Sequence, residues 1–411
     1  MSSPGNSSRL LVRDLDQVVT PSGTGAPLRG DELGRVDIVE HAYVLCDEGR
    51  IVETGRMSDL GSLEGDVEEI DGRGLCALPG LVDCHTHACF AGDRAQEFEL
   101  RSRGASYEEL HAAGGGILST VEATRAAGEE GLREAVRRHR EWMLHAGTTT
   151  FEAKSGYGLD RDTELASLRA IAAEGGIPTW LGAHAVPPEF DDGDAYLDFA
   201  LAEVLPEAAR IAEAADVFLE RGAFTAEQSR RYLEACRDAG LALRLHGDQF
   251  SEQGAIPLAI ELGARSVDHL EATGDEGARK LAASDVVGVM LPVAALVLGR
   301  PMPPGRKLVD AGAAVALATD FNPGSAFCES LPLVMSLACT QLGLSPGEAL
   351  AAVTVNAAHV LGRSDRIGRL ATGYDADVTL LGAPDWRHLA YHVGGELVAG
   401  VIHSGRLEWR R

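Results

Sequence analysis

Leu78-Pro79-Gly80-Leu81-Val82-Asp83-Cys84-His85-Thr86-His87 is the segment from which the fold can be predicted. Its short apolar run ends in two histidines that are one residue apart. Side chains at positions i and i+2 of a strand project to the same face. The segment therefore predicts a strand that places two imidazoles side by side where the chain leaves the core. Imidazole is a common metal ligand, so the pair is a candidate metal site, and a purely structural histidine pair is the alternative.

The length and the net charge of the chain limit the class of protein to which it can belong. A chain of 411 residues, 45% of them hydrophobic, predicts two domains or a barrel with an accessory domain. Its formal charge of −25 argues against nucleic acid and anionic membranes as partners. Any anionic substrate must therefore meet a local cationic group. No apolar run reaches the ~18 residues that span a bilayer, and no secretory signal is evident.

The cysteines predict neither a disulfide framework nor a zinc-finger array. There are seven, irregularly spaced and without a C-x-x-C pair. Cys84 and Cys89 flank the two histidines and are alternative thiolate ligands, with plain core packing as the simpler interpretation. A reduced, cytoplasmic protein fits this pattern best.

Short apolar runs alternate with longer amphipathic segments after about residue 78, which is typical of repeated βα units. Eight such units predict an α/β fold, a (β/α)8 TIM-like barrel whose active site lies at the carboxyl ends of its strands. The residues that close each run are therefore where chemistry is expected. The predicted strands are 81–85, 148–153, 179–183, 217–220, 241–246, 265–269, 286–291 and 314–318.

Helix start signals fall between these runs. Two residue pairs have the spacing of a capping box, and a last helix is predicted to open after residue 344 and to end before Gly362. The only run of three glycines, Gly114–Gly116, predicts a loop above the barrel mouth. The start signals are Ser106 with Glu109, Thr225 with Gln228, and Ser345 with Pro346 and Glu348.

The two flanks differ from the centre of the chain. Residues 9–77 and 366–411 alternate apolar and polar residues in short pieces with turn signals between them. They predict one small β-sandwich built from both termini. The predicted domains are residues 1–77 and 366–411 for the two parts of the sandwich, and residues 78–365 for the barrel.

Candidate metal ligands close three of the eight runs. His85 ends the first run and His87 comes two residues later, His246 ends the fifth run, and Asp320 follows the eighth. For any one of them a hydrogen-bonded structural role is the alternative. At the ends of runs one, five and eight of a closed ring, three imidazoles and one carboxylate suit Zn²⁺ or Fe²⁺ and leave room for a water. We therefore expect a bound metal.

The same set predicts hydrolysis. A divalent ion lowers the pKa of a bound water toward neutrality. Asp320 can bind the ion, accept the proton of the water and pass it to a leaving nitrogen. His269, at the end of the sixth run, is expected beside the metal, hydrogen-bonded to the nucleophile or to the developing oxyanion. A further metal ligand and a structural residue are the alternatives for His269.

Other polar residues stand near the same strand ends. Arg94 could clamp a carboxylate with two hydrogen bonds, and an exposed loop arginine is the alternative. Lys154 raises the alternative of a carbamylated lysine that bridges two metals, although no spare ligand is evident. His184 either contacts the substrate or has a capping or core role, and Glu220 is expected to be structural.

The motifs resemble those of the amidohydrolase superfamily, whose members are metal-dependent (β/α)8 barrels. The first segment, together with His246, His269 and Asp320, carries that resemblance. Longer blocks resemble the imidazolonepropionase family within it, hydrolases of a cyclic amide in histidine degradation. The resemblance runs from about residue 75 to 365. The blocks are residues 90–98 (FAGDRAQEF), 112–117 (AAGGGI), 152–159 (EAKSGYGL), 246–250 (HGDQF) and 320–325 (DFNPGS).

The resemblance implies one Zn²⁺ or Fe ion, held by His85, His87, His246 and Asp320. It implies opening of the ring of 4-imidazolone-5-propanoate, with Asp320 relaying a proton to the departing ring nitrogen. The only partner expected is this small molecule, and the sequence leaves a homodimer open. The implied substrate contacts are Arg94, Tyr157, His184, Gln249 and Ser325, and the product N-formimidoyl-L-glutamate would also touch Asn322 and Gly324.

Two positions depart from the family pattern. Cys84 replaces the proline expected before the first ligand, which alters backbone stiffness more than chemistry. Gln249 stands where some relatives carry glutamate, and because glutamine cannot titrate, proton transfer falls to Asp320 and His269.

The nearest alternative function is a deaminase of the same superfamily, acting on the exocyclic amine of a nucleobase or a triazine. It would carry a carboxylic acid just after the fifth-strand histidine, so Gln249 and the anion-binding Arg94 argue against it. A metal-binding regulatory protein without turnover is the second alternative, and the complete set of proton-transfer residues argues against that.

Overall fold

The computed structural model describes residues 9–104 and 116–411. The chain divides into two compact units, residues 1–84, 142–150 and 330–411 in one and residues 85–141 and 151–329 in the other. The predicted pair Ser106 and Glu109, and Gly114 and Gly115 of the glycine run, lie outside the described residues. In the part of the chain that is described, no helix has the length and apolar character needed to cross a membrane.

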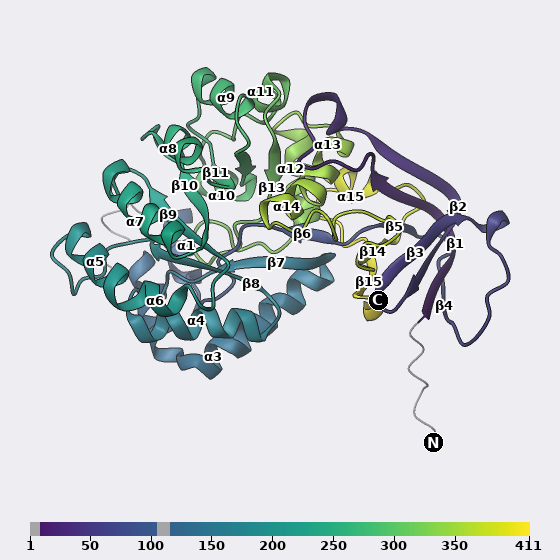
Figure 1. The fold of residues 1–411 in the computed structure, drawn as a ribbon, viewed down its shortest axis with the longest axis horizontal. Helices are drawn as coiled ribbons and strands as arrows, with labels where there is room; N and C mark the ends of the chain where they lie inside the picture. The colour runs from purple at the N-terminus through teal and green to yellow at the C-terminus, as the bar shows by residue number, and fades with distance from the viewer. Residues whose placement is uncertain (1–8, 105–115) are drawn as a thin grey trace. The chain divides into compact units, whose positions relative to one another are not determined.

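Eight strands form one parallel sheet that follows the order of the chain from β6 to β13 (Figure 1). All eight predicted strands are present, with ends that differ by up to three residues. The strands are β6 (Leu81–Asp83), β7 (Thr148–Lys154), β8 (Ile177–Ala183), β9 (Ala214–Leu219), β10 (Ala242–Gly247), β11 (Ser266–His269), β12 (Val287–Met290) and β13 (Val315–Leu317).

The sheet closes on itself just beyond β6 and β13. Thr86 forms a parallel bridge with Phe321. The amide of His87 donates to the carbonyl of Phe321 at 2.9 Å, and the amide of Asp320 donates to the carbonyl of His85 at 3.1 Å. These bonds join the first strand to the eighth and confirm the predicted TIM-like barrel. They also bring together side chains more than 230 positions apart.

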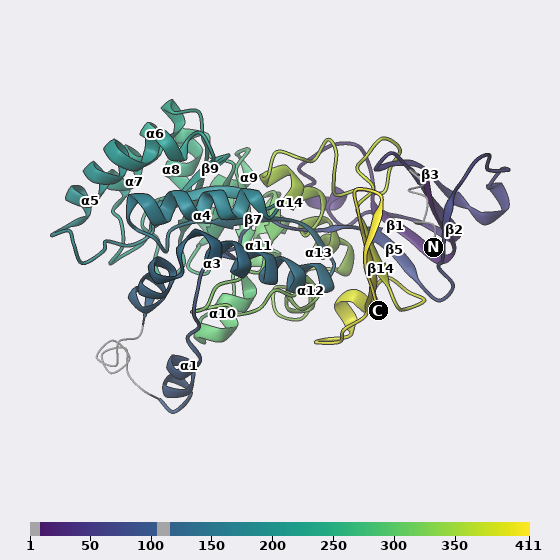
Figure 2. The same ribbon diagram turned by 90° about the horizontal axis from the view of Figure 1, so that it is seen from below.

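Helices lie on the outside of the barrel strands (Figure 1). As predicted, α7 begins with a capping box: the hydroxyl of Thr225 accepts from the amide of Gln228, whose side chain accepts from the amide of Thr225. Figure 2 shows α1 standing out from the other helices. The helices are α1 (Ala95–Ser102), α3 (Ile117–His145), α4 (Arg161–Ala173), α5 (Gly193–Phe199), η3 (Ala200–Val204), α6 (Leu205–Ala208), α7 (Ala226–Asp238), α8 (Ala255–Leu262), α9 (Asp275–Ala282), α10 (Pro292–Leu298) and α11 (Gly305–Ala311).

The single helix predicted after residue 344 is wrong, because two short helices occupy that segment. Ser345 and Glu348 do form a capping box at the start of α13 (Pro346–Ala352). The chain then breaks at Thr354 (φ −130°, ψ −91°) before α14 (Val355–Val360) begins. The hydroxyl of Thr354 donates to the carbonyl of Leu350 at 2.6 Å, and such side-chain bonds compete with the helical backbone pattern.

Both ends of the chain build a second, mixed sheet, in the order β16-β15-β14-β5-β1-β2-β3, with β4 paired to β1. This confirms a small β domain made from both termini. A bulge between Val12 and Leu15 divides β1, so that one half pairs with β4 and the other with β5. One apolar cluster draws on strands from both ends, including Val12, Val44 and Val378.

The strands of this second sheet are β1 (Arg9–Pro21), β2 (Val36–Asp47), β3 (Arg50–Arg56), β4 (Glu68–Asp71), β5 (Cys76–Pro79), β14 (Val378–Leu381), β15 (Val398–His403) and β16 (Arg406–Arg410). The remaining short elements are η1 (Gly30–Glu32), η2 (Met57–Asp59), α12 (Leu331–Thr340) and α15 (His388–Tyr391).

Candidate metal centre

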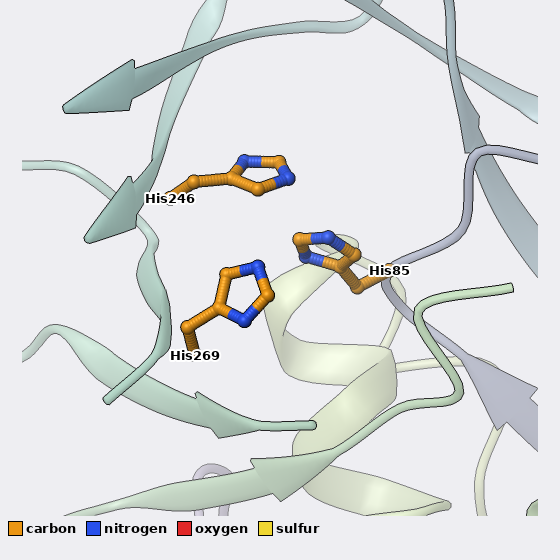
Figure 3. A group of neighbouring side chains, drawn as sticks. All are labelled: His85, His246 and His269. Carbon is orange, nitrogen blue, oxygen red and sulfur yellow. The ribbon is translucent and has the colours of Figure 1, made fainter. Parts of the chain in front are cut away.

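Three buried imidazoles face one another at the carboxyl end of the barrel (Figure 3). His85 follows β6, His246 lies in β10 and His269 ends β11. The ring centroids of His85 and His246 are 4.4 Å apart, and those of His246 and His269 are 5.3 Å apart. The strand ends therefore direct histidines from three parts of the sequence at one point.

His87 and Asp320 complete the cluster. Nε2 of His87 lies 3.2 Å from Nε2 of His246 and 3.4 Å from Oδ1 of Asp320. The same oxygen lies 3.6 Å from Nε2 of His85. Ligand atoms of His85, His87 and Asp320 lie within 4.8 Å of one another, and so do those of His85, His246 and His269. The structure thus brings together the four predicted ligands and also His269.

Two buried carboxylates that the sequence analysis missed stand behind these histidines. Oδ2 of Asp268 lies 2.6 Å from Nδ1 of His85, and Oδ2 of Asp216 lies 3.1 Å from Nδ1 of His246. A carboxylate in this position keeps the proton on Nδ1, so that Nε2 carries a free lone pair. An acidic residue inside an apolar run, as in Ala215-Asp216-Val217, was the available signal.

The positions of these protons show whether the donor atoms could bind a metal. The Nε2 lone pairs of His85 and His246 and a carboxylate oxygen of Asp320 are directed into the same small space. An arrangement of electron pairs with no proton between them is suited to a cation. Together with His87, the donor set of three imidazoles and one carboxylate suits Zn²⁺ or Fe²⁺.

Burial keeps the imidazoles in their metal-binding, neutral form. It lowers the pKa of His85 and His87 far below the usual value, and the pKa of His246 to about 4. Burial also raises the pKa of Asp320 to about 6, although His269 opposes that shift. For His269, burial alone would lower the pKa, but Glu271, 3.4 Å away, raises it more strongly.

The backbone at two of these residues is strained. His269 and Leu270 have φ values of +87° and +73°, and Asp320 has φ +56°. Left-handed conformations of residues other than glycine cost about 1–3 kcal/mol each and occur most often at functional sites. The hydrogen bond from the amide of Asp320 to His85 helps to hold one of them.

Lys154 belongs to a buried charge network beside the cluster. Its Nζ lies 2.8 Å from Oε1 of Glu152 and 2.9 Å from Oδ2 of Asp216. Arg244 lies 3.2 Å from the same oxygen of Glu152. Burial opposes the charge on Lys154, but Asp216 and Glu152 more than offset this effect and raise its pKa. A carbamylated lysine forms from the neutral amine, so the network argues against the two-metal alternative.

The structure gives the cysteines near the cluster and Glu220 structural roles. Burial raises the pKa of Cys89 to about 12, and its thiol donates to the carbonyl of Ser167. Neither Cys84 nor Cys89 belongs to a group of converging ligand atoms within the described residues. Glu220 accepts from the amides of Phe250 and Ser251 at 2.8 and 3.2 Å, and so it anchors the loop after β10.

A cavity of about 220 Å³ opens onto the cluster. Every residue implied as a substrate contact lines it: Arg94, Tyr157, His184, Gln249, Asn322, Gly324 and Ser325. The sequence analysis did not single out several other lining residues, none of which closes a predicted strand. These are Arg101, Ile117, Phe218, Phe250 and Leu298.

The loop after β13 is held by Asn322. Its side-chain oxygen accepts from the amides of Gly324 and Ser325, both at 2.8 Å, and its NH₂ group donates to the carbonyl of Asp320 at 2.6 Å. A Cβ at Gly324 would lie 2.3 Å from Nη1 of Arg94, so any side chain at this position would displace that guanidinium. On another wall, Nδ1 of His184 donates to the carbonyl of Gly156 at 2.8 Å, which leaves Nε2 as an acceptor.

Comparisons with known proteins agree with this architecture. The model of the Amidohydrolase family matches residues 76–407. The chain is 60% identical over 407 residues to the imidazolonepropionase of Rubrobacter xylanophilus, covering 97% of this chain and 98% of that protein. It is 46% identical to the imidazolonepropionase of Herpetosiphon aurantiacus over 414 residues, covering 97% and 96%.

Solved structures share the fold at much lower identity. Escherichia coli guanine deaminase has a TM-score of 0.72 at 15% identity, covering 98% of this chain and 99% of that chain. An adenosine deaminase from Xanthomonas campestris with bound zinc has a TM-score of 0.71 at 18% identity, covering 98% and 94%. These two comparisons concern the fold alone. From its motifs, its barrel and its full-length relatives, the chain belongs to the amidohydrolase family and, within it, to the imidazolonepropionase family.

Proposed function

We propose that this protein hydrolyses the ring amide of 4-imidazolone-5-propanoate to N-formimidoyl-L-glutamate, a step in histidine degradation. The observation that carries the proposal is one cavity whose lining includes both four members of the His-Asp cluster and Arg94; the four are His87, His246, His269 and Asp320. Relatives up to 60% identical over nearly the whole chain are named imidazolonepropionase. A substrate with a hydrolysable ring and a carboxylate matches both parts of this lining.

His85, His87, His246 and Asp320 would hold a single ion, for which both Zn²⁺ and Fe²⁺ suit the donors. A bound divalent cation supplies Lewis acidity and lowers the pKa of a water toward neutrality. Metal analysis of protein purified without added metal, paired with activity measurements, distinguishes zinc from iron. His269 shares a converging group with His85 and His246, so its role as an alternative ligand is tested by measuring the metal content of His269→Gln.

Asp320 would transfer the proton that the reaction requires. Water adds to the ring carbonyl carbon, the bond from that carbon to the ring nitrogen breaks, and the nitrogen takes up a proton. The pKa of Asp320, about 6, lets its carboxylate accept a proton from water and release it to the departing nitrogen. Gln249 cannot do this, because an amide does not titrate.

His269 would stabilise the negative charge that develops on the carbonyl oxygen. Glu271 favours its cationic form, and a charged donor placed at a developing oxyanion lowers the barrier more than a neutral donor. Division of the work between Asp320 and His269 predicts that the two residues affect different parts of a pH–rate profile.

The remaining lining residues would orient the substrate. Nε2 of His184 is an acceptor for a ring N–H, and the Tyr157 ring, 5.3 Å from that of His184 between centroids, packs beside it. Gln249 and Ser325 offer neutral hydrogen bonds. Asn322 and Gly324 would also contact the opened product, while Arg94 would meet its carboxylate.

A direct assay tests the function. Imidazolonepropanoate, generated from urocanate by urocanase, is mixed with the metal-loaded protein. Loss of the ultraviolet absorbance of the ring without release of ammonia is the expected result. Release of ammonia favours the deaminase alternative, and unchanged absorbance contradicts the proposal.

We also propose that the enzyme works in the cytoplasm. Its seven cysteines are free thiols, and unpaired cysteines are typical of proteins in reducing compartments. A homodimer stays a prediction, which analytical ultracentrifugation of the purified protein decides.

A further inference from the structure

Two arginines flank Gly324 at the rim of the cavity. Arg94 lies on one side, with Nη1 2.3 Å from the position that a Cβ of residue 324 would take. Arg101 lies against the carbonyl of the same residue, with Nη1 and Nη2 each 3.4 Å from its oxygen. Both guanidinium groups line the cavity. Arg94 immediately precedes α1, which stands out from the other helices (Figure 2), and Arg101 lies near the end of that helix, so both charges belong to one helix.

The charge of Arg94 is already compensated. Its Nε and Nη2 donate to the two carboxylate oxygens of Glu97 at 2.8 and 2.6 Å. Glu97 also accepts from the amide of Gly116 at 2.7 Å. Burial opposes ionisation of Glu97, but these donors more than offset the effect and lower its pKa. Arg94 therefore enters the cavity as half of a neutral, bidentate ion pair.

Arg101 has no such partner in the part of the chain that the structure describes. Among residues 9–104 and 116–411, no carboxylate lies within ion-pair distance of its guanidinium. Its contacts there are the two to the Gly324 carbonyl, at the outer limit for a hydrogen bond, and a position 5.9 Å from the centre of the Phe98 ring. Arg94, Glu97 and Arg101 together carry one positive charge, and that charge belongs to Arg101.

We propose that Arg101 is a specificity-determining residue, which supplies the net positive charge that binds the propanoate carboxylate of the substrate. Arg94 then provides a fixed donor, Nη1, while Arg101 provides the attraction that a chain with a net charge of −25 needs in order to hold an anion. The identity of the anion rests on the proposed function, but the charge arrangement does not.

The geometry is suited to a carboxylate. Two guanidinium groups on either side of one glycine can each donate to one oxygen of a planar carboxylate. The long contacts to Gly324 cost little to give up when a stronger acceptor arrives. A neutral ligand of the same shape gains little from Arg101, because it offers no charge to pair.

The test compares two competitive inhibitors of the metal-loaded enzyme, imidazole-4-propanoate and imidazole-4-propanol. The variants are Arg101→Gln and Arg101→Lys. Arg103→Gln is the matched control, because Arg103 is an exposed arginine near the end of the same helix and pairs with Glu99. Metal content and the unfolding midpoint are measured for every variant.

Arg101→Gln is expected to weaken inhibition by the acid about 10- to 100-fold, the range for hydrogen bonds to charged groups. Inhibition by the alcohol should change less than about twofold. Arg101→Lys should recover part of the loss, and Arg103→Gln should change neither inhibitor. For the substrate, KM should rise with little change in kcat.

Two results would overturn the proposal: unchanged inhibition by the acid in Arg101→Gln, or equal weakening of both inhibitors. The second would mean that Arg101 acts through structure rather than charge. Failure of the parent protein to open the imidazolone ring would instead contradict the proposed function, while the ratio of the dissociation constants of the acid and the alcohol, measured by isothermal titration calorimetry, would still decide the role of Arg101.

Discussion

Replacing Asp216 by asparagine should weaken both the fold and the metal site, and to different extents. Oδ2 of Asp216 contacts Nδ1 of His246 at 3.1 Å and Nζ of Lys154 at 2.9 Å, while its Oδ1 accepts from the amide of Val217 at 2.7 Å. All three neighbours are donors. An asparagine has one acceptor oxygen and a donating NH₂ group, so it must place that group against at least one of them.

The magnitude follows from two separate losses. Lys154 would keep only Glu152, which Arg244 also contacts, and breaking one side of a buried ion pair costs about 3–5 kcal/mol. Because an amide can still accept one bond, we expect the lower end, about 3 kcal/mol. The proton on Nδ1 of His246 would lose its carboxylate acceptor, a change that lowers metal affinity by about 10- to 100-fold in comparable sites.

Two assays separate these losses. Urea unfolding of metal-free protein measures stability, and competition with a chelator measures zinc affinity. The double variant Asp216→Asn/Lys154→Met should recover stability, because it removes the unpaired ammonium, but it should not recover zinc affinity. Glu261→Gln, which removes a carboxylate from an exposed pair with Arg230, should change neither quantity.

The reasoning fails if Asp216→Asn loses less than about 1 kcal/mol and binds zinc within twofold of the parent. It also fails if the double variant is no more stable than the single one, since the cost would then not come from Lys154.

Three further predictions test other parts of the molecule. Asp320→Ala should lower kcat by about 10²- to 10⁴-fold even in the fraction of protein that retains metal; single-turnover assays normalised to metal content would contradict the relay if they gave near-normal rates. Gly324→Ala should displace Arg94, because the new Cβ would lie 2.3 Å from Nη1, so KM for the substrate should rise with the unfolding midpoint unchanged, and an unaltered KM would count against the predicted contact. Burial lowers the pKa of His139 to about 4 from the usual 6.5 of a histidine, so between these pH values the unfolded chain binds a proton that the folded chain does not. The free energy of unfolding should therefore fall by up to about 3 kcal/mol as pH drops from 6.5 to 4. When it is measured by urea unfolding across this pH range, it should depend less steeply on pH in His139→Gln than in the parent, and an identical pH dependence would refute the assignment.

The barrel could be predicted because each of its strands is marked by a pattern of neighbouring residues. Runs such as 241–246 and 265–269 are apolar over the length of a strand and are bounded by polar segments, so their positions needed no tertiary information. The break at Thr354 was not predictable in this way, because a side-chain bond to Leu350 decides it, and a threonine within a helix forms that bond in some settings only.

The candidate ligands were predictable for a related reason. A histidine or aspartate that closes a strand lies at the carboxyl end of a barrel, independently of the helices around it. For this reason the sequence alone predicts that His85, His246 and Asp320 lie close together. The carboxylates that hold the Nδ1 protons of these histidines could not be predicted from the sequence. In the sequence Asp216 and Asp268 are isolated acids within apolar runs. Lys154 is a candidate metal bridge by sequence alone, and its contacts with Glu152 and Asp216 argue against that role.

The eight-strand architecture, the chemistry of the metal donors and the family can all be predicted from the amino-acid sequence. The position of the proton on each histidine, the ion pair of Glu97 with Arg94 and the lack of a carboxylate partner for Arg101 among the described residues become visible in the folded chain alone. The two kinds of information differ in range. Strand periodicity is a property of neighbouring residues, whereas pairing of charges depends on closure of the ring and on the register of strands that lie far apart along the chain.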